Sequence, residues 1–368
     1  MAGLTVFLLS LHQAYDPHDL ADPHRVLKIT DSSCNLVTPD SSLASRQARS
    51  DQHTKQLSLS EASLATGLSV SSWGRLPRRK RPLHVSDPSK SVLCHSFSGG
   101  RLGNHLFEYA SVLGIAEATN KSFFFYNDEV VQKVLKTPPV QKSTWRLRAR
   151  CFRAEKLRES HGCQYDRQLL LSQEPGKDYD VGEYLQSWLY FDEIREEVRE
   201  AVRFTDDIVR EATQVVACLR RQFPNSTLVG IHVRRGDLIT NEKYGREGFL
   251  TAPPEFFQRA MTYFRRRFSR VTFVVLGEDR KWSVEHIPPV DNDVVVLEPK
   301  SPAVDMQILS MMDHMIRTVG TFGWWAAFKM AGRPTVVFLK EFVRRGTWMG
   351  SFYSENAADY MLPSWVPM

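Results

Sequence analysis

Val229-Gly-Ile-His-Val-Arg-Arg-Gly-Asp237 is an apolar, β-branched run that ends abruptly in charged residues. Such a run predicts a buried strand with its charges at the carboxyl end. Open α/β sheets bind ligands at that end of their strands. Arg234 and Arg235 together suit a diphosphate, because a guanidinium binds phosphate oxygens in a bidentate way. For these two residues alone, ordinary surface charge is the competing interpretation.

Strands and helices alternate over most of the chain. Strands are expected at 228–233, 271–276, 294–297, 315–319 and 335–339, with helices at 254–268, 302–313 and 324–330. An earlier β-turn-α-β unit is expected from strands at 92–97 and 122–126 and a helix at 106–118 with Asn104 as its cap. Helices are also expected at 188–203 and 206–223, while residues 128–180 show no interpretable pattern. This alternation predicts an α/β fold with parallel sheets, in two Rossmann-like domains that face each other across a cleft.

The first 90 residues differ from the rest. They hold 15 serines and scattered prolines without a regular apolar period, which predicts a disordered stem over residues 1–90. The basic cluster at 78–81 is interpreted as an exposed linker. The apolar run at 4–11 is too short to span a bilayer, which needs about 20 residues. The domains are then expected at 91–225 and 226–368.

Charge and cysteine content restrict the function. The formal net charge is +6, and it divides evenly between residues 1–90 and the remainder, so binding to nucleic acid is not implied. The five cysteines lack CxxC spacing, which disfavours a zinc site. Cys151 and Cys163 could close a short disulfide loop in an oxidising compartment, or both could be free buried thiols. Sequons at Asn120 and Asn225 would matter if the chain is lumenal.

Two further segments could contact a ligand. The turn 99–104 reads Gly-Gly-Arg-Leu-Gly-Asn, which lets a backbone approach a ligand at a helix N-terminus but is not a GxGxxG fingerprint. At 318–328 a strand ends and a helix begins near Phe322, which presents free amides and the Thr321 hydroxyl to a phosphate. Trp324 and Trp325 are expected in the core, at least one of them. Asp305 either reads the N1–H and N2–H groups of guanine or is a solvated acid at a helix start.

Five blocks of the sequence, in this order, closely resemble the galactoside alpha-1,2-fucosyltransferases of glycosyltransferase family 11. They are GGRLGNHLFEYASVLGIAEATNK, VGIHVRRGDLI, FVVLGEDRKW, SPAVDMQIL and TVGTFGWWAAF. The resemblance implies a GT-B-like fold, GDP-fucose as donor and no required metal. It also implies a donor-binding set comprising Gly103, Asn104, His232, Arg234, Arg235, Asp305, Thr321, Phe322 and Gly323. His105 stands where this family usually has Gln.

The resemblance implies catalysis by Arg235, which would stabilise the charge on the departing diphosphate. The general base is either Asp237, which is slightly favoured, or Glu242 in the following loop; Asp237 as a structural residue of that loop is the competing interpretation. The string from Asp291 to Asp293 resembles a metal-binding DxD motif, but turn chemistry is the preferred interpretation.

The expected activity is therefore inverting transfer of fucose from GDP-fucose to a terminal galactose in alpha-1,2 linkage. The acceptor would be a galactose-terminated glycan of a glycoprotein or glycolipid. Transfer to a different acceptor or linkage, or a catalytically silent glycan-binding protein on the same fold, are the alternatives. The family leads us to expect a Golgi location, in the lumen or at the membrane with type II topology, although no clear anchor is visible in this sequence.

Overall fold

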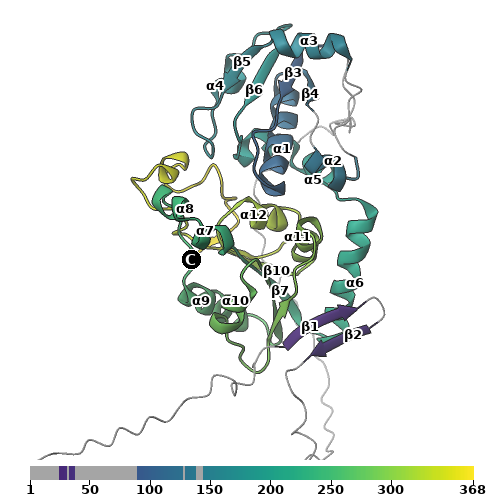
Figure 1. Cartoon of the computed structure of the whole chain (residues 1–368), viewed down its shortest axis with the longest axis vertical. Helices are drawn as coiled ribbons and strands as arrows, with labels where there is room; N and C mark the ends of the chain where they lie inside the picture. Colours follow the sequence, from purple (N-terminus) through teal and green to yellow (C-terminus); the bar gives the residue numbers. More distant parts are fainter. Residues whose placement is uncertain (1–24, 31–32, 38–88, 127–128, 138–143) are drawn as a thin grey trace, which may run out of the picture.

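The computed structural model describes residues 25–30, 33–37, 89–126, 129–137 and 144–368. These residues form two sheets of mainly parallel strands with helices between them (Figure 1). The α/β class with parallel sheets, expected from the alternation of strands and helices, is confirmed. The N-terminal unit stands at the top of Figure 1, and the C-terminal unit lies below it.

The N-terminal sheet has four parallel strands in the order β4-β3-β6-β5. Their bounds are Val92–His95 for β3, Ser122–Phe125 for β4, Glu155–Arg158 for β5 and Tyr179–Gly182 for β6. Helix α1 (Leu102–Ala118) joins β3 to β4, as the sequence predicted. The helix begins earlier than expected, so Arg101 is its N-cap and Asn104 lies inside its first turn. Asn104 is therefore available to face a neighbouring element.

The region 128–180, for which no pattern was interpretable, contains several short elements. They are α2 (Glu129–Val134), α3 (Trp145–Arg153), β5, α4 (Gln168–Leu171) and β6. Strand β5 lies at the edge of its sheet and exposes most of its side chains. An exposed edge strand needs no apolar alternation, which explains why sequence periodicity did not reveal it.

The second sheet has the order β12-β11-β10-β7-β8-β9-β1-β2. All its strands are parallel except β2. The five strands expected from the sequence are β7 (Thr227–Val233), β8 (Val271–Gly277), β9 (Val294–Leu297), β10 (His314–Arg317) and β11 (Val336–Phe338). Strand β12 (Val366–Pro367) extends the sheet beyond β11.

Three helices of the second unit were expected and three were not. The expected helices are α9 (Pro254–Arg265), α11 (Pro302–Ser310) and α12 (Thr321–Phe328). Helix α12 begins one residue before the start expected near Phe322 and three residues before the helical range expected at 324–330. Its opening residues include a glycine and a threonine, which are turn-forming residues, so the start was placed too late. The additional helices are α7 (Gly236–Thr240), α8 (Glu242–Glu247) and α10 (Arg280–His286).

Strands β1 (Arg25–Thr30) and β2 (Ser33–Val37) correct the prediction that residues 1–90 form a disordered stem. Strand β1 pairs in parallel with β9, which otherwise would be an open edge of the sheet. The pairing joins segments that are far apart in the chain, so no local pattern records it. The basic cluster at 78–81 and the apolar run at 4–11 lie outside the described residues.

The connection between the two sheets is made of η1 (Trp188–Ile194), α5 (Arg195–Ala201) and α6 (Asp206–Gln222). A single helix was expected at 188–203, but Phe191 has non-helical backbone angles and breaks it. Helix α6 packs against α11 of the second unit, although it precedes the expected boundary at 225.

The end of the chain returns to the N-terminal unit. The Trp188 indole donates to the Ala358 carbonyl at 2.9 Å, and the Ser187 hydroxyl donates to the Asp359 carbonyl at 2.7 Å. The Asp359 carboxylate accepts from the Tyr165 amide at 2.9 Å. Packing therefore crosses the expected boundary between residues 225 and 226 in both directions.

An aromatic cluster joins the two units. Phe107 of α1 packs against Trp324 and Trp325 of α12, with ring centroids 4.4 and 5.2 Å apart. Tyr360 and Phe191 complete the cluster. Both tryptophans are fully buried, which confirms the expectation that at least one belongs to the core. Because these large rings dominate the shared core, α1 and α12 are held firmly against each other.

Neither alternative for Cys151 and Cys163, a bond between them or two free thiols, describes both residues. Cys151 bonds to Cys94, and Cys163 is a free, buried thiol. Spacing along the chain suggested only a short loop between Cys151 and Cys163, but α3 packs against β3 and brings Cys151 to Cys94. Among the described residues, no helix is both long and apolar enough to cross a membrane.

Candidate donor site at the junction of the two sheets

The carboxyl ends of β7, β8 and β10 meet at one edge of the second sheet. Strand β7 pairs with β8 and β10 in parallel register, so the residues that follow each strand lie side by side. These residues are the arginine pair after β7, the Glu278-Asp279 pair after β8 and the loop 318–320 after β10. The sequence had predicted charged residues at the end of β7. The parallel register explains why the loops after β8 and β10 lie beside these residues.

Arg234 is fixed by both its backbone and its side chain. Its amide donates to the Thr318 hydroxyl at 3.0 Å, and its Nη2 donates to the Asp237 carboxylate at 3.1 Å. Gly320 has a φ of 102°, and a Cβ there would lie 2.5 Å from Nη1 of Arg234. Any other residue at 320 would be strained and would displace this guanidinium.

Arg235 is held by α10. Its guanidinium lies 4.0 Å from the ring centre of Trp282, and its Nε lies 3.5 Å from the Asp279 carboxylate. Asp279 also caps α10, because its side chain accepts from the Trp282 amide at 3.1 Å. The Arg235 side chain is only 15% exposed, so its orientation is set before any ligand arrives.

The two candidates for the general base have different surroundings. Asp237 pairs with Arg234 and lies 3.6 Å from Nη2 of Arg101, so it is part of the charged edge. Glu242 begins α8, where its side chain is 86% exposed and pairs with Arg246 one turn later. Arg101 pairs in addition with Glu278. Of the two carboxylates, only Asp237 contacts the arginines of the site.

His232 presents a neutral ring to the same edge. Burial, together with the nearby Arg317 and Arg234, lowers the pKa of His232 to about 3. The ring stacks on Phe322 at 5.1 Å, and its Nδ1 has no hydrogen-bond partner among the described residues. A Cβ at Gly323 would lie 2.5 Å from that nitrogen, so only glycine fits beside it. His232 is therefore an uncharged, buried group whose Nδ1 packs against Gly323 at the start of α12.

The N-terminus of α12 meets the N-terminus of α1 at this edge. The Thr321 hydroxyl donates to the Asn104 side chain at 2.7 Å. A Cβ at Gly103 would lie 2.6 Å from the Thr321 hydroxyl and 2.8 Å from the Phe322 amide nitrogen, so the two helices touch where Gly103 has no side chain. The first amides of α12 have no partners within the helix and carry the positive end of its dipole. These contacts bring Gly103, Asn104, Thr321 and Phe322 together, as the sequence had grouped them.

Asp305 lies in the first turn of α11. Its carboxylate accepts from the Lys300 amide at 3.0 Å, and burial raises its pKa to about 6 against the opposing effects of that hydrogen bond and the Lys300 charge. The Ser301 hydroxyl accepts from the Val304 amide in the same turn. Asp305 is thus half-buried in a helix cap, which corrects the picture of a solvated acid and leaves guanine recognition as a prediction.

Arg317, which the sequence analysis did not single out, lies beneath the site. It is fully buried, and its Nη2 donates to the Gly320 carbonyl at 2.9 Å. Its other neighbours are the Met361 sulfur and the rings of Tyr360 and Trp365, and no carboxylate pairs with it among the described residues. Burial lowers its pKa. Arg317 could have been identified from the sequence as an arginine at the end of the apolar strand β10, the same pattern that identified Arg234 directly after β7.

His105 lies on the N-terminal side of the junction. It is buried, and its ring stacks on Phe97 at 5.1 Å.

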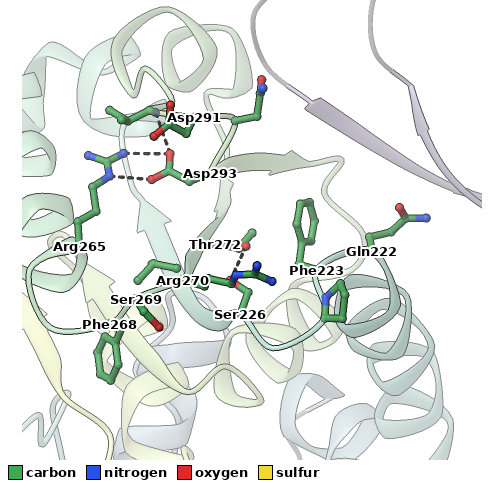
Figure 2. A pocket seen from close by; sticks show the side chains of 14 residues that line it. Gln222, Phe223, Ser226, Arg265, Phe268, Ser269, Arg270, Thr272, Asp291 and Asp293 are labelled. Atoms are coloured by element: carbon green, nitrogen blue, oxygen red, sulfur yellow. Dashed lines mark hydrogen bonds and ion pairs between the residues drawn. The ribbon is translucent and has the colours of Figure 1, made fainter. Parts of the chain in front are cut away.

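The DxD-like string lies at the amino ends of the strands of the second sheet, opposite the end that carries the arginines. Asp293 accepts two hydrogen bonds from Arg265, at 2.7 and 3.0 Å, and Asp291 and Asn292 form a turn with positive φ (Figure 2). A pocket of about 500 Å³ lies there, lined by these residues and the amino ends of β7 and β8. The seven residues of β7 separate the two edges by about 20 Å. Asp291 and Asp293 therefore do not join the arginine site.

The residues at the junction suit a diphosphate. They supply guanidinium groups, a neutral imidazole, a hydroxyl and helix-terminal amides. Among the described residues, no cluster of three or more His, Cys, Asp or Glu side chains could hold a metal ion. The fold and these residues define an α/β protein with a site, between its two units, whose chemistry suits an anionic, diphosphate-type ligand.

Comparison with known proteins gives the family. Residues 84–367 match glycosyl transferase family 11, so the chain belongs to this family and is an enzyme of the glycosyltransferase class. The chain is similar to galactoside alpha-(1,2)-fucosyltransferase 1 of Oryctolagus cuniculus, with 31% identity covering 73% of this chain and 71% of the relative. It is also similar to galactoside 2-alpha-L-fucosyltransferase SEC1 of Bos taurus, with 29% identity covering 73% and 71%.

Among solved structures, the chain is similar to POFUT1 in complex with GDP, with a TM-score of 0.42 and 11% identity over 69% of this chain and 99% of that one. This likeness is too low to support an argument about the site.

Proposed function

We propose that this protein transfers fucose from GDP-fucose to a terminal galactose of a glycan, in alpha-1,2 linkage and with inversion at the fucose C1. The observation that carries the proposal is the fixed pair Arg234 and Arg235 after β7, with Arg234 beside Gly320 at the start of α12 and Arg235 held against Trp282. The names of the curated relatives support the donor sugar, the galactoside acceptor and the linkage.

The reaction places charge where the site can stabilise it. The bond between fucose C1 and the β-phosphate oxygen breaks, and the bond between C1 and the galactose O2 forms. Negative charge builds up on the departing diphosphate, next to Arg235 and the first turn of α12. Stabilisation of this kind, by fixed groups of a site, requires no metal ion. We therefore propose that transfer is independent of metal.

The proton of the galactose O2 must leave during this step. We propose that Asp237 accepts it, because this carboxylate lies at the edge beside the arginines while Glu242 points into solvent. Asp305 would bind the guanine base, with the charged form of its carboxylate accepting from N1–H and N2–H. His232, which is neutral, would contact the nucleotide without opposing its charge.

We also propose a Golgi location, in the lumen or associated with the membrane. The Cys94–Cys151 disulfide supports a compartment in which disulfides persist. The expected acceptors are glycans of glycoproteins or glycolipids.

Purified protein incubated with GDP-fucose and a panel of galactosides tests the proposal. We expect a product whose fucose is attached to O2 of galactose in the α configuration, which NMR of the product determines. Attachment of fucose to a different hydroxyl would contradict the proposed alpha-1,2 linkage. Binding of glycans without any release of GDP would contradict the proposed transfer and indicate a catalytically silent binding protein.

A further inference from the structure

A strained turn follows strand β6 in the N-terminal unit. Glu183 and Leu185 have φ values of 74° and 49°, although neither is glycine, and Tyr184 lies between them. Left-handed backbone of this kind is costly for residues with a side chain and persists only where the surroundings enforce it. Strained residues of this type cluster at functional sites.

Buried groups enforce this turn from two sides. The Leu185 amide donates to the Glu159 carboxylate at 2.7 Å, and the Leu185 carbonyl accepts from the Ser111 hydroxyl of α1, also at 2.7 Å. Glu159 is buried, and that burial raises its pKa to about 8. The next amide, of Gln186, donates to the Gly162 carbonyl at 3.0 Å. The conformation of the two residues after Tyr184 is thus fixed by the fold.

The turn lies at the edge where a second substrate would approach. Strands β3 and β6 are neighbours and parallel, so the turn after β6 lies beside the turn that leads from β3 into Gly103 and Asn104. Tyr184 is 36% exposed. Its pKa is raised by burial and by the charges of Glu108, Glu183 and Tyr244, and Tyr244 belongs to α8 of the other unit. Tyr184 therefore lies at the carboxyl end of the first sheet, beside the turn that leads into Gly103 and Asn104.

We propose that Tyr184 binds the acceptor, with the apolar face of the terminal galactose stacked on its ring. This inference rests on the proposed transfer to a galactoside and adds the place where that sugar is held. A pyranose has a face of C–H groups, and a half-exposed aromatic ring offers an apolar surface that binds it. The braced turn explains why the ring keeps its orientation when the site is empty.

Two substitutions test the role of the ring. With lactose as the acceptor, Tyr184→Ala is expected to raise the KM for lactose about tenfold or more, because the stacking surface is lost. Tyr184→Phe keeps that surface, so its KM for lactose should stay within about threefold of the unaltered protein. The Kd for GDP should stay within about twofold in both variants, because Tyr184 is outside the arginine edge. Trp145→Ala is the matched control, since Trp145 is a 75% exposed aromatic residue on α3.

An unchanged KM for lactose in Tyr184→Ala, or a parallel loss of GDP affinity, would overturn the inference. So would a Tyr184→Phe variant as impaired as Tyr184→Ala. Lactose binding is also measured directly by NMR in the presence of GDP, a readout that does not require turnover. If the unaltered protein binds lactose through Tyr184 but transfers no fucose to it, the proposed function fails while the inference stands.

Discussion

Replacement of Arg235 by alanine should lower the rate of transfer strongly while leaving the fold intact. The substitution removes the ring contact at 4.0 Å to Trp282 and the ion pair at 3.5 Å to Asp279. A cation–π contact contributes about 0.5–2 kcal/mol and a partly exposed ion pair up to about 1 kcal/mol. Asp279 keeps its hydrogen bond from the Trp282 amide, so no carboxylate is left without a partner. The melting temperature should therefore fall by only a few degrees.

The effect on catalysis should be much larger. Loss of one preorganised donor to developing charge costs about 2.7–4 kcal/mol, which is a factor of about 10²–10³ in kcat. Arg235→Lys should recover little of this, because an ammonium cannot reproduce a guanidinium held flat against an indole. The assay is steady-state transfer from GDP-fucose, with thermal melting of each variant. Arg246→Ala, on the exposed face of α8, serves as the control.

Turnover of Arg235→Ala within a few-fold of the unaltered protein would refute the reasoning. A drop in melting temperature large enough to unfold the variant at the assay temperature would also refute it, because the structure assigns Arg235 little role in stability.

Three further predictions concern Asp305, metal dependence and the Cys94–Cys151 disulfide. Asp305→Asn should weaken GDP binding about tenfold, as measured by calorimetry. In the unaltered protein the affinity for GDP should fall as the pH drops through about 6, because the buried carboxylate takes up a proton and can no longer accept from guanine. Equal GDP affinity at pH 5 and pH 8 would contradict this prediction. Transfer should survive excess EDTA, and a loss of transfer that Mn²⁺ restores would contradict the proposed metal independence. Loss of the Cys94–Cys151 bond, which spans 57 residues, should lower the free energy of unfolding by about 4 kcal/mol on chain-entropy grounds. The measurement is urea unfolding of a variant that carries Cys94→Ser and Cys151→Ser, without reductant because Cys218 is also disulfide-bonded; unfolding curves that coincide with those of the unaltered protein would count against it.

The sequence predicted what depends on local pattern. Strands β7 to β11 were found because buried parallel strands are continuous apolar runs, and the arginines after β7 stood out against such a run. Strand β1 and the Cys94–Cys151 bond were missed because each depends on a partner far along the chain. The exposed edge strand β5 carries no apolar period and could not be found by this route.

The sequence also named most of the residues that meet at the junction, but it did not predict which of them contact each other. The sequence grouped Gly103, Asn104 and Thr321 only through the family resemblance, whereas the structure brings them into contact through two helix termini. Arg317 was overlooked although it ends an apolar strand. Tyr184 gives no signal in sequence, because its importance rests on the backbone angles of its neighbours.

The return of the chain end to the N-terminal unit bears on how the protein is made. Trp188, Ser187 and Tyr165 take their hydrogen-bond partners from Ala358 and Asp359, which follow the whole second sheet except β12. The ribosome completes the first sheet long before it synthesises these partners. The unit that is synthesised first therefore cannot complete its hydrogen bonds until most of the second unit has also been synthesised.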